Sequence, residues 1–367
     1  MKKLINDRYL LVTFKSKSLE NNALGISPER TFHIYLPPKY HENKTQLYPV
    51  IYFLHGYGGD IQNRIIISKK KIKSQYPFLF RLLLPRVFKN FPTFELIDQK
   101  IKEGVFPPFI LVQPDGSTGL NGKFDLKRDD GSPSVKGSFY VNSQYTGNFG
   151  DSIFIDLIKY VDDNFRTIPD KEHRAIMGAS MGGYGTLLAA LSHHYLFNSA
   201  VSLSPVITPY DLLNHHMVVP LFAKIYGKKK ARIQGDKELV DILDTIDLIF
   251  SPKSRLVPED IDPSNRKFNL ENKLAIENWR YSDLLYLLNE KGENLTQLTL
   301  LINCEESDEF NLAPQVKKFH KRMDAMQIPH RLEIYKDEYA AKVSPHQIGI
   351  LFKIIEGIKF TLDEFKP

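Results

Sequence analysis

Six residues, Gly178-Ala179-Ser180-Met181-Gly182-Gly183, join a short apolar strand pattern to a helix pattern of small residues. The strand pattern occupies 173–177 and the helix pattern runs through 182–191. In a G-x-S-x-G turn of this kind the serine backbone is strained and its hydroxyl stands exposed above the sheet. Both glycines are needed because a Cβ at either position would clash in so tight a turn. The stretch therefore predicts a nucleophilic Ser180, and the alternative is an ordinary glycine-rich turn.

Short apolar runs rich in β-branched and aromatic residues recur along the chain, with helical patterns between them. These runs are 9–14, 31–36, 48–54, 109–113, 175–177, 199–203, 298–303 and 331–335. The runs that begin at Val50, Ile110 and Leu298 are almost continuously apolar, which is typical of strands buried on both faces of a parallel sheet. The run 31–36 alternates more, as an antiparallel edge strand would. We expect an α/β fold with a mostly parallel central sheet of about eight strands and helices on both faces.

Two longer segments, 61–105 and 206–297, do not fit a minimal sheet of this kind. The second is too long for a structureless loop, so we expect it to contain helices. Neither segment has a Gly/Ser-rich or Pro-rich stretch that would serve as a linker to a separate domain. We therefore expect residues 1–367 to form a single domain, with both segments as helical insertions that form a cap or lid.

Composition excludes several classes of protein. Apolar residues make up 42% and charged residues 25%, close to the average of globular proteins, which excludes a mostly disordered chain. One cysteine excludes an internal disulfide and a Cys-rich metal site. A net charge of +6 is small for a nucleic-acid binder of this length. No apolar run is long enough to span a membrane, and polar residues at 6–8 interrupt any signal peptide, so we expect a cytoplasmic protein.

A second glycine-rich turn, residues 55–59, follows directly after the buried strand pattern that ends at residue 54. An enzyme that transfers an acyl group needs two N–H donors to hold the developing oxyanion. We interpret the backbone N–H groups of Tyr57 and Met181 as these donors. Gly56 and Gly58 would then let the backbone approach the substrate. The alternative is a plain turn between a strand and a helix.

The acid and the base of such a site follow the serine along the chain. The strand pattern 298–303 runs into an acidic loop at 304–309. Asp308 is the expected acid because it lies far enough past the strand to turn back toward the serine. Glu305 and Glu306 remain alternatives. If none of these acids is catalytic, the segment is simply an acidic loop exposed to solvent.

Three histidines follow this loop, at 320, 330 and 346. Only His346 is expected on a loop after the last strand, at the edge where such sheets place catalytic groups. His320 falls inside the helix pattern 314–326 and His330 enters the next strand, so both are expected at the surface. His346 would take the proton of Ser180, and Asp308 would orient the imidazole and stabilise its charged form.

Together these residues resemble the esterase D-like family of α/β-hydrolases. That family includes S-formylglutathione hydrolases, tributyrin esterases, feruloyl esterases and the antigen 85 mycolyltransferases. The resemblance extends over about residues 30–360. It is carried by the stretches at 31–38, 49–56, 113–116, 137–143, 178–183 and 308–310.

The resemblance implies an α/β-hydrolase fold and gives the same roles to Ser180, Asp308 and His346 and to the two oxyanion donors. It also implies that the loop 145–151 borders the substrate, with Asn148 and Phe149 as contacts. The chain departs from the family pattern at Glu305 and at 344–345, where relatives often have glycine. The cysteine-bearing oxyanion motif of S-formylglutathione hydrolases is absent, which makes that activity less expected.

The leading hypothesis is a serine carboxylesterase that hydrolyses short-chain acyl esters through an acyl-enzyme. A carbohydrate-ester or feruloyl-type esterase and an acyltransferase are alternatives within the same chemistry. An alternative of another class is a catalytically silent binding protein with a hydrolase fold. We expect no metal, no cofactor, no nucleic-acid partner and no integral membrane segment. The expected partner is a small-molecule ester.

Overall fold

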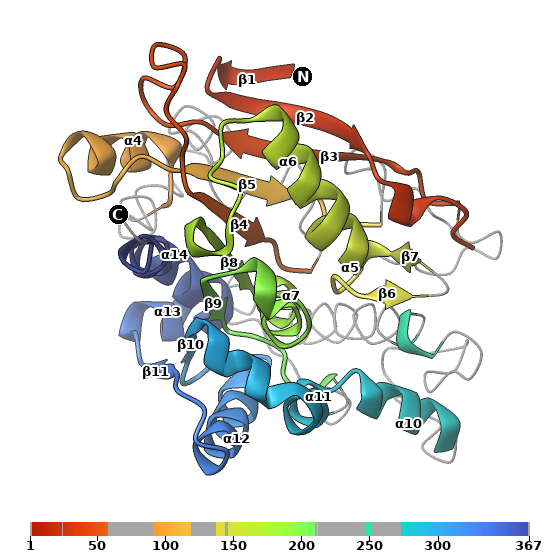
Figure 1. Cartoon of the computed structure of the whole chain (residues 1–367). Helices are drawn as coiled ribbons and strands as arrows, with labels where there is room; N and C mark the ends of the chain where they lie inside the picture. Colours follow the sequence, from red (N-terminus) through yellow and green to blue (C-terminus); the bar gives the residue numbers. More distant parts are fainter. Residues whose placement is uncertain are drawn as a thin grey trace.

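A nine-stranded sheet forms the centre of the part of the chain that the structure describes (Figure 1). The structure is a computed structural model. It describes residues 2–23, 25–57, 91–118, 137–143, 146–209, 211, 247, 249–251 and 273–365. The strands of the sheet are β1 (Lys2–Asn6), β2 (Tyr9–Lys15), β3 (Glu29–Tyr35), β4 (Val50–Leu54), β5 (Ile110–Pro114), β8 (Arg174–Ala179), β9 (Ser199–Leu203), β10 (Thr299–Glu305) and β11 (Arg331–Tyr335). A separate small hairpin pairs β6 (Asn142–Ser143) with β7 (Gly147–Asn148).

The strand order in the sheet is β1-β2-β3-β5-β4-β8-β9-β10-β11. The pairs β1–β2, β2–β3 and β3–β5 are antiparallel, and all pairs from β5 to β11 are parallel. All eight strand patterns predicted from the sequence are strands, and β1 is additional. One expectation was wrong: β3 is antiparallel but does not lie at the edge, because the hairpin of β1 and β2 pairs outside it.

Helices and short helical turns connect these strands. The helices are α4 (Phe94–Lys102), α5 (Phe149–Asp151), α6 (Ile158–Asn164), α7 (Met181–Ser192), α10 (Lys273–Tyr281), α11 (Leu284–Lys291), α12 (Leu312–Ala325), α13 (Glu338–Val343) and α14 (Pro345–Asp363). A π-helical turn, η2 (Ser152–Leu157), joins α5 to α6. The 3-10 turns are η1 (Lys17–Leu19), η3 (Lys171–His173), η4 (His194–Leu196) and η6 (Gly292–Gln297).

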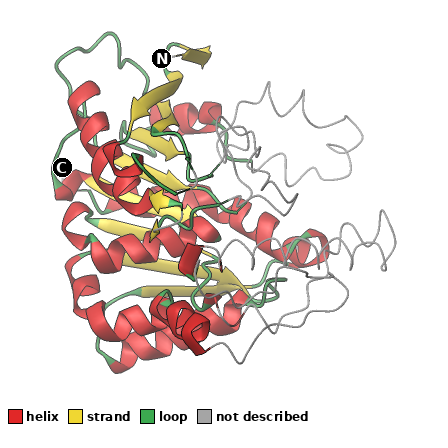
Figure 2. Ribbon diagram, turned by 90° about the vertical axis from the view of Figure 1, so that its right-hand side faces the viewer, coloured by secondary structure: helices red, strands yellow, loops and turns green. Residues whose placement is uncertain are grey.

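Two apolar cores lie on the two faces of the sheet, as the near-continuous apolar runs predict. Successive side chains of a strand point to opposite faces. In β4, Val50 and Leu54 belong to one core, whereas Ile51 and Phe53 belong to the other. The first core is covered by α6, α7, α11 and α12, and the second by α4 and α14. Figure 2 shows the strands side by side with these helices packed along them.

The carboxyl ends of the central parallel strands meet at one edge of the sheet. In the register, Ala179 of β8 pairs with Leu203 of β9, which in turn pairs with Asn303 of β10. Residues that directly follow these strands therefore emerge side by side. This edge brings the segment after β8 close to the segment after β10, two strands away.

The two predicted insertions are only partly among the described residues. The described part of 61–105 contains α4, and that of 206–297 contains α10, α11 and η6, so the expected helices are present in the second segment. Their cap or lid role stays a prediction. Among the described residues, no helix combines the length and the apolar character needed to cross a membrane.

Candidate active site

Ser180 lies at the strand-to-helix turn that the sequence predicts, between β8 and α7. Its backbone has φ 57° and ψ −116°, a conformation that a residue with a side chain adopts only at a cost. The turn is held by two hydrogen bonds. The N–H of Ser180 donates to the carbonyl of Leu203 at 2.9 Å, and the N–H of Tyr184 donates to the carbonyl of Ser180 at 3.0 Å.

The glycines around Ser180 are required by close backbone packing. A Cβ on Gly178 would lie 2.3 Å from the carbonyl oxygen of Gly182. A Cβ on Gly182 would lie 2.1 Å from the carbonyl oxygen of Leu54, at the end of β4. Both distances are far below van der Waals contact with backbone atoms that cannot move independently. The turn can thus approach β4 only where side chains are absent.

The loop after β4 is fixed beside this serine. A Cβ on Gly56 would lie 3.4 Å from the Cβ of Ser180 and 4.0 Å from its Oγ. His55 is buried and holds the loop through both ring nitrogens. Its Nε2 accepts a hydrogen bond from the N–H of Gly116 at 2.9 Å, so its Nδ1 donates to the carbonyl of Gly56 at 2.8 Å. His55 therefore serves the loop's geometry.

Tyr140 reinforces the same loop from a strained position of its own. Phe139 and Tyr140 have consecutive positive φ angles of 50° and 57°. The buried phenol of Tyr140 donates a hydrogen bond to the carbonyl of His55 at 2.8 Å, and burial raises its pKa. Its ring fills space that a Cβ on Gly116 or Gly185 would enter. The sequence motif at 137–143 is thus a brace for the residues 55–57.

Tyr57 and Met181 lie next to each other beside Gly137. A Cβ on Gly137 would be 2.5 Å from the sulfur of Met181 and 3.1 Å from Cδ2 of Tyr57. Met181 is the first residue of α7, and the first N–H groups of a helix have no partner within the helix. Both expected oxyanion donors therefore belong to turns that meet at Ser180.

Asp308 and His346 are brought together by the segments after β10 and before α14. The Oδ2 atom of Asp308 lies 2.6 Å from Nδ1 of His346, and both side chains are buried. A carboxylate can only accept, so Nδ1 carries the proton and Nε2 keeps its lone pair. The other carboxylate oxygen of Asp308 accepts from the N–H of Phe310 at 3.0 Å, and the Phe310 ring packs on His346.

The position of His346 differs from the expected loop in one respect. It is the second residue of α14, and a short helix, α13, precedes it after β11. Ser344 caps α14 by accepting from the N–H of Gln347, and Pro345 begins the helix. His346 is therefore fixed by a capped helix N-terminus rather than by a flexible loop.

Glu309 is a site residue that the sequence reasoning missed. Its Oε1 accepts from the hydroxyl of Ser344 at 2.6 Å, and its Oε2 accepts from the backbone N–H of His346 at 2.6 Å. It follows Asp308 directly, so one dipeptide contacts both the ring and the backbone of the histidine. The acidic loop itself was the only signal, because the pairing requires knowing where α14 begins.

The other acids of the loop are engaged elsewhere. Glu305 is fully buried and accepts from the N–H groups of Ser307 and Asp337. Glu306 forms an ion pair with Lys317 at 3.7 Å. Cys304, at the start of the same loop, is not an acid of the site: burial raises the pKa of its thiol, and the nearby carboxylate of Asp308 raises that pKa further. Of the acids considered from the sequence, Asp308 is the one hydrogen-bonded to His346.

The expected substrate contacts have different surroundings. Phe149 is fully buried with Leu19 and Ile26, and Arg30 lies over its ring, so it packs the fold here. Asn148 is exposed, and its contact with substrate stays a prediction. Gly58 lies outside the described residues.

The model of the Esterase family, whose description is "Putative esterase", matches residues 25–349. The chain belongs to this family. It is an esterase, a hydrolase of the serine class, and the resemblance found in the sequence is confirmed. No curated protein matches the chain.

Solved structures share the fold at low sequence identity. A ferulic acid esterase is 16% identical, with a TM-score of 0.56 and 98% of both chains covered. An S-formylglutathione hydrolase from Agrobacterium tumefaciens is 16% identical, with a TM-score of 0.53, covering 98% of this chain and 95% of that one. The fluorophosphonate-binding serine hydrolase F of Staphylococcus aureus is 17% identical, with a TM-score of 0.52 and 98% of both chains covered. These likenesses confirm the α/β-hydrolase fold.

Proposed function

We propose that this esterase is a serine carboxylesterase that hydrolyses short-chain acyl esters through a triad of Ser180, His346 and Asp308. The observation that carries the proposal is the buried hydrogen bond between Asp308 and His346, 2.6 Å long. It sets the imidazole in the tautomer whose Nε2 can accept a proton. Ser180 follows β8, two strands away from β10 at the same edge of the sheet, in the strained turn typical of such nucleophiles.

The proposed reaction has two halves. His346 takes the hydroxyl proton as Ser180 attacks the ester carbonyl, and the resulting imidazolium is stabilised by the Asp308 carboxylate. The alcohol leaves with the proton that His346 returns, which leaves an acyl-enzyme on Ser180. Water, deprotonated by the same histidine, then releases the carboxylic acid and restores the serine.

The developing oxyanion is proposed to be held by the backbone N–H groups of Tyr57 and Met181. Their turns meet beside Ser180, and the braces from His55 and Tyr140 fix the first of them. Donors fixed in advance are effective because they need no reorganisation as charge develops. No step requires a metal or an organic cofactor.

The preference for short acyl chains and the cytoplasmic location remain predictions. Two structural relatives are named as a ferulic acid esterase and an S-formylglutathione hydrolase. Feruloyl esters and S-formylglutathione are therefore the comparison substrates. A carbohydrate-ester esterase or an acyltransferase would use the same three side chains and the same two backbone N–H groups. Because the mechanism would be shared, the assay has to compare activity on different substrates.

The test is hydrolysis of p-nitrophenyl esters from acetate to dodecanoate by the wild type and by Ser180→Ala. Methyl ferulate and S-formylglutathione are assayed in parallel. We expect the highest kcat/KM with the shortest chains and no activity above background in the variant. Full activity in Ser180→Ala would exclude this nucleophile. A folded wild type without activity on any ester would instead favour a silent binding protein.

A further inference from the structure

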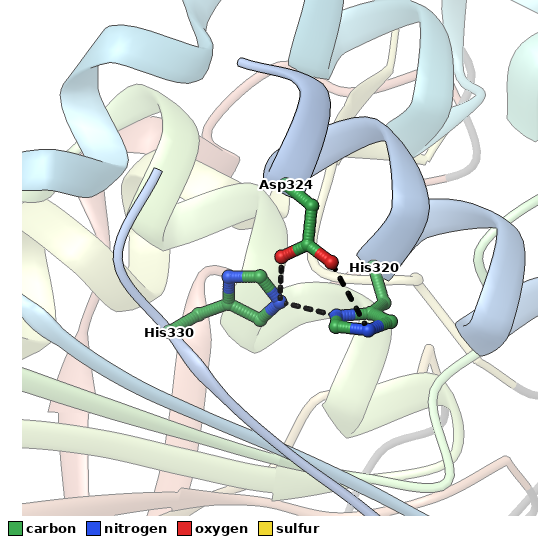
Figure 3. Close-up of side chains that lie close together, drawn as sticks. All are labelled: His320, Asp324 and His330. Atoms are coloured by element: carbon green, nitrogen blue, oxygen red, sulfur yellow. Dashed lines mark hydrogen bonds and ion pairs between the residues drawn. The ribbon is translucent and has the colours of Figure 1, made fainter. Parts of the chain in front are cut away.

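A cluster of side chains with metal-binding donors lies at the opposite end of the parallel strands from Ser180, because His330 precedes β11 whereas Ser180 follows β8. Figure 3 shows its three side chains. His320 and Asp324 are one helical turn apart near the end of α12, and His330 directly precedes β11. One donor atom from each residue lies within 4.8 Å of the others. The five residues of β11 separate this cluster from the strand ends at the candidate active site, by about 16 Å at 3.3 Å per residue.

The ring of His330 has a defined orientation and tautomer. Its side chain is only 3% exposed, which corrects the expectation of a surface histidine. Nδ1 lies 2.8 Å from the carbonyl oxygen of Ile328. A carbonyl only accepts, so Nδ1 carries the proton and Nε2 presents its lone pair to the cluster. A histidine that binds a metal through one ring nitrogen usually donates the N–H of the other to a carboxylate, a backbone carbonyl or water.

His320 lies between two acceptors. Its Nδ1 is 2.7 Å from Nε2 of His330, and its Nε2 is 3.3 Å from a carboxylate oxygen of Asp324. Because Nε2 of His330 is an acceptor, Nδ1 of His320 is the donor in their contact, and Nε2 of His320 keeps a lone pair. That lone pair faces a carboxylate oxygen of Asp324, so two atoms that can each bind a cation lie 3.3 Å apart.

The spacing of the donor atoms suits a cation. In a tetrahedral zinc site the ligand atoms lie about 3.3 Å apart, because Zn–N bonds are about 2.0–2.1 Å long. Oδ2 of Asp324 lies 3.3 Å from Nε2 of His320, and its other oxygen, Oδ1, lies 3.8 Å from Nε2 of His330. The side chains of His320 and Asp324 are 32% and 59% exposed, so small rotations and an aqua ligand are possible there.

We propose that His320, Asp324 and His330 bind one divalent transition-metal ion of the zinc class, with water completing the coordination. Two imidazoles and one carboxylate are donors that zinc accepts readily, whereas Mg²⁺ and Ca²⁺ take oxygen ligands. The ion would tie the last turn of α12, which packs on β10, to the entry of the edge strand β11. Its role is to stabilise this edge of the fold, not to act on the ester.

The experiment uses the untagged full-length protein after treatment with a chelator and dialysis. Calorimetric titration with ZnCl₂ is expected to give one ion per chain with micromolar or tighter Kd, and Zn²⁺ but not Mg²⁺ is expected to raise Tm. His320→Ala and Asp324→Asn should each weaken binding at least about 10-fold and abolish the rise in Tm, since each removes a ligand. Two variants are used because either position is exposed enough to be changed without loss of folding.

The matched control is His173→Ala. His173 forms a pair with Asp170 at 2.7 Å that resembles the pair in the cluster, and within the described part of the chain no third metal-binding side chain lies beside it. This variant is expected to bind Zn²⁺ as the wild type does. The proposal is overturned if the folded wild type does not bind Zn²⁺. It is equally overturned if both cluster variants bind as tightly as the control.

Discussion

Replacement of Asp308 by asparagine tests the proposed triad without changing the size of the side chain. In the structure, one oxygen of Asp308 accepts from the N–H of Phe310 and the other accepts from Nδ1 of His346. An asparagine has only one oxygen. If that oxygen stays with Phe310, the amide N–H₂ faces the histidine and forces Nδ1 to become an acceptor. The proton then moves to Nε2, the atom that must act as the base.

The size of the effect separates two explanations. Loss of one hydrogen bond alone costs about 1–3 kcal/mol, which is about 5- to 150-fold in rate. Loss of the correct tautomer removes general-base catalysis and, in the serine-protease triad, lowers kcat about 10,000-fold. That factor corresponds to about 5.4 kcal/mol. We therefore expect Asp308→Asn to lower kcat for p-nitrophenyl acetate by about 1,000- to 10,000-fold, with little change in KM.

The control variant is Glu306→Gln in the same loop. It also removes one negative charge, but its carboxylate is exposed and faces only Lys317 among the ion pairs found in the described residues. Its kcat should stay within about twofold of the wild type, since exposed pairs contribute little. Circular dichroism spectra are used to check that both variants are folded. A folded Asp308→Asn enzyme that keeps more than about one hundredth of the wild-type kcat would refute the tautomer argument.

Further expectations concern the supports of the site and the stability of the fold. In Glu309→Gln the side chain has one oxygen left for two donors, the Ser344 hydroxyl and the His346 N–H. Steady-state assays should show kcat lowered by up to about 100-fold, with KM nearly unchanged. Gly182→Ala places a Cβ 2.1 Å from the carbonyl of Leu54 and should lower the free energy of unfolding in urea by about 3 kcal/mol or more. Gly25→Ala, at φ 64° in open space, should cost only about 1 kcal/mol. Burial raises the pKa of Asp283 to about 6, so its contribution favours folding at low pH and is lost as pH rises through about 6. Asp283→Asn should therefore raise Tm relative to the wild type near pH 8 but not near pH 4, as scanning calorimetry would show.

Much of the architecture could be read from the sequence because the central strands are buried on both faces. The runs at β4, β5 and β10 are largely apolar for that reason. The edge of the sheet was harder. Lys2 and Lys3 at the start of β1 do not form an apolar run, so the strand that covers β2 gave no signal.

The candidate site likewise has one part that the sequence predicts and another that it does not. Ser180 has a local signature, since the turn around it demands glycine at fixed positions. The partner of His346 depends on where two loops meet, and the sequence could rank the acids of the loop only by their distance from the strand end. Glu309 and His330 were missed for a related reason: their partners are backbone groups and side chains of elements whose ends sequence patterns do not define.

The two neighbouring acids Asp308 and Glu309 show why this loop carries so many charges. The first contacts the ring of His346, and the second contacts the backbone N–H of the same residue and the hydroxyl that caps its helix. Rotation of the imidazole is opposed by one carboxylate and displacement of the helix N-terminus by the other. A lone acid would hold the ring but leave its backbone free to shift, and a displacement of about 1 Å can cost 100-fold in rate. The acidic loop is therefore better understood as a two-point clamp than as one catalytic acid among solvated neighbours.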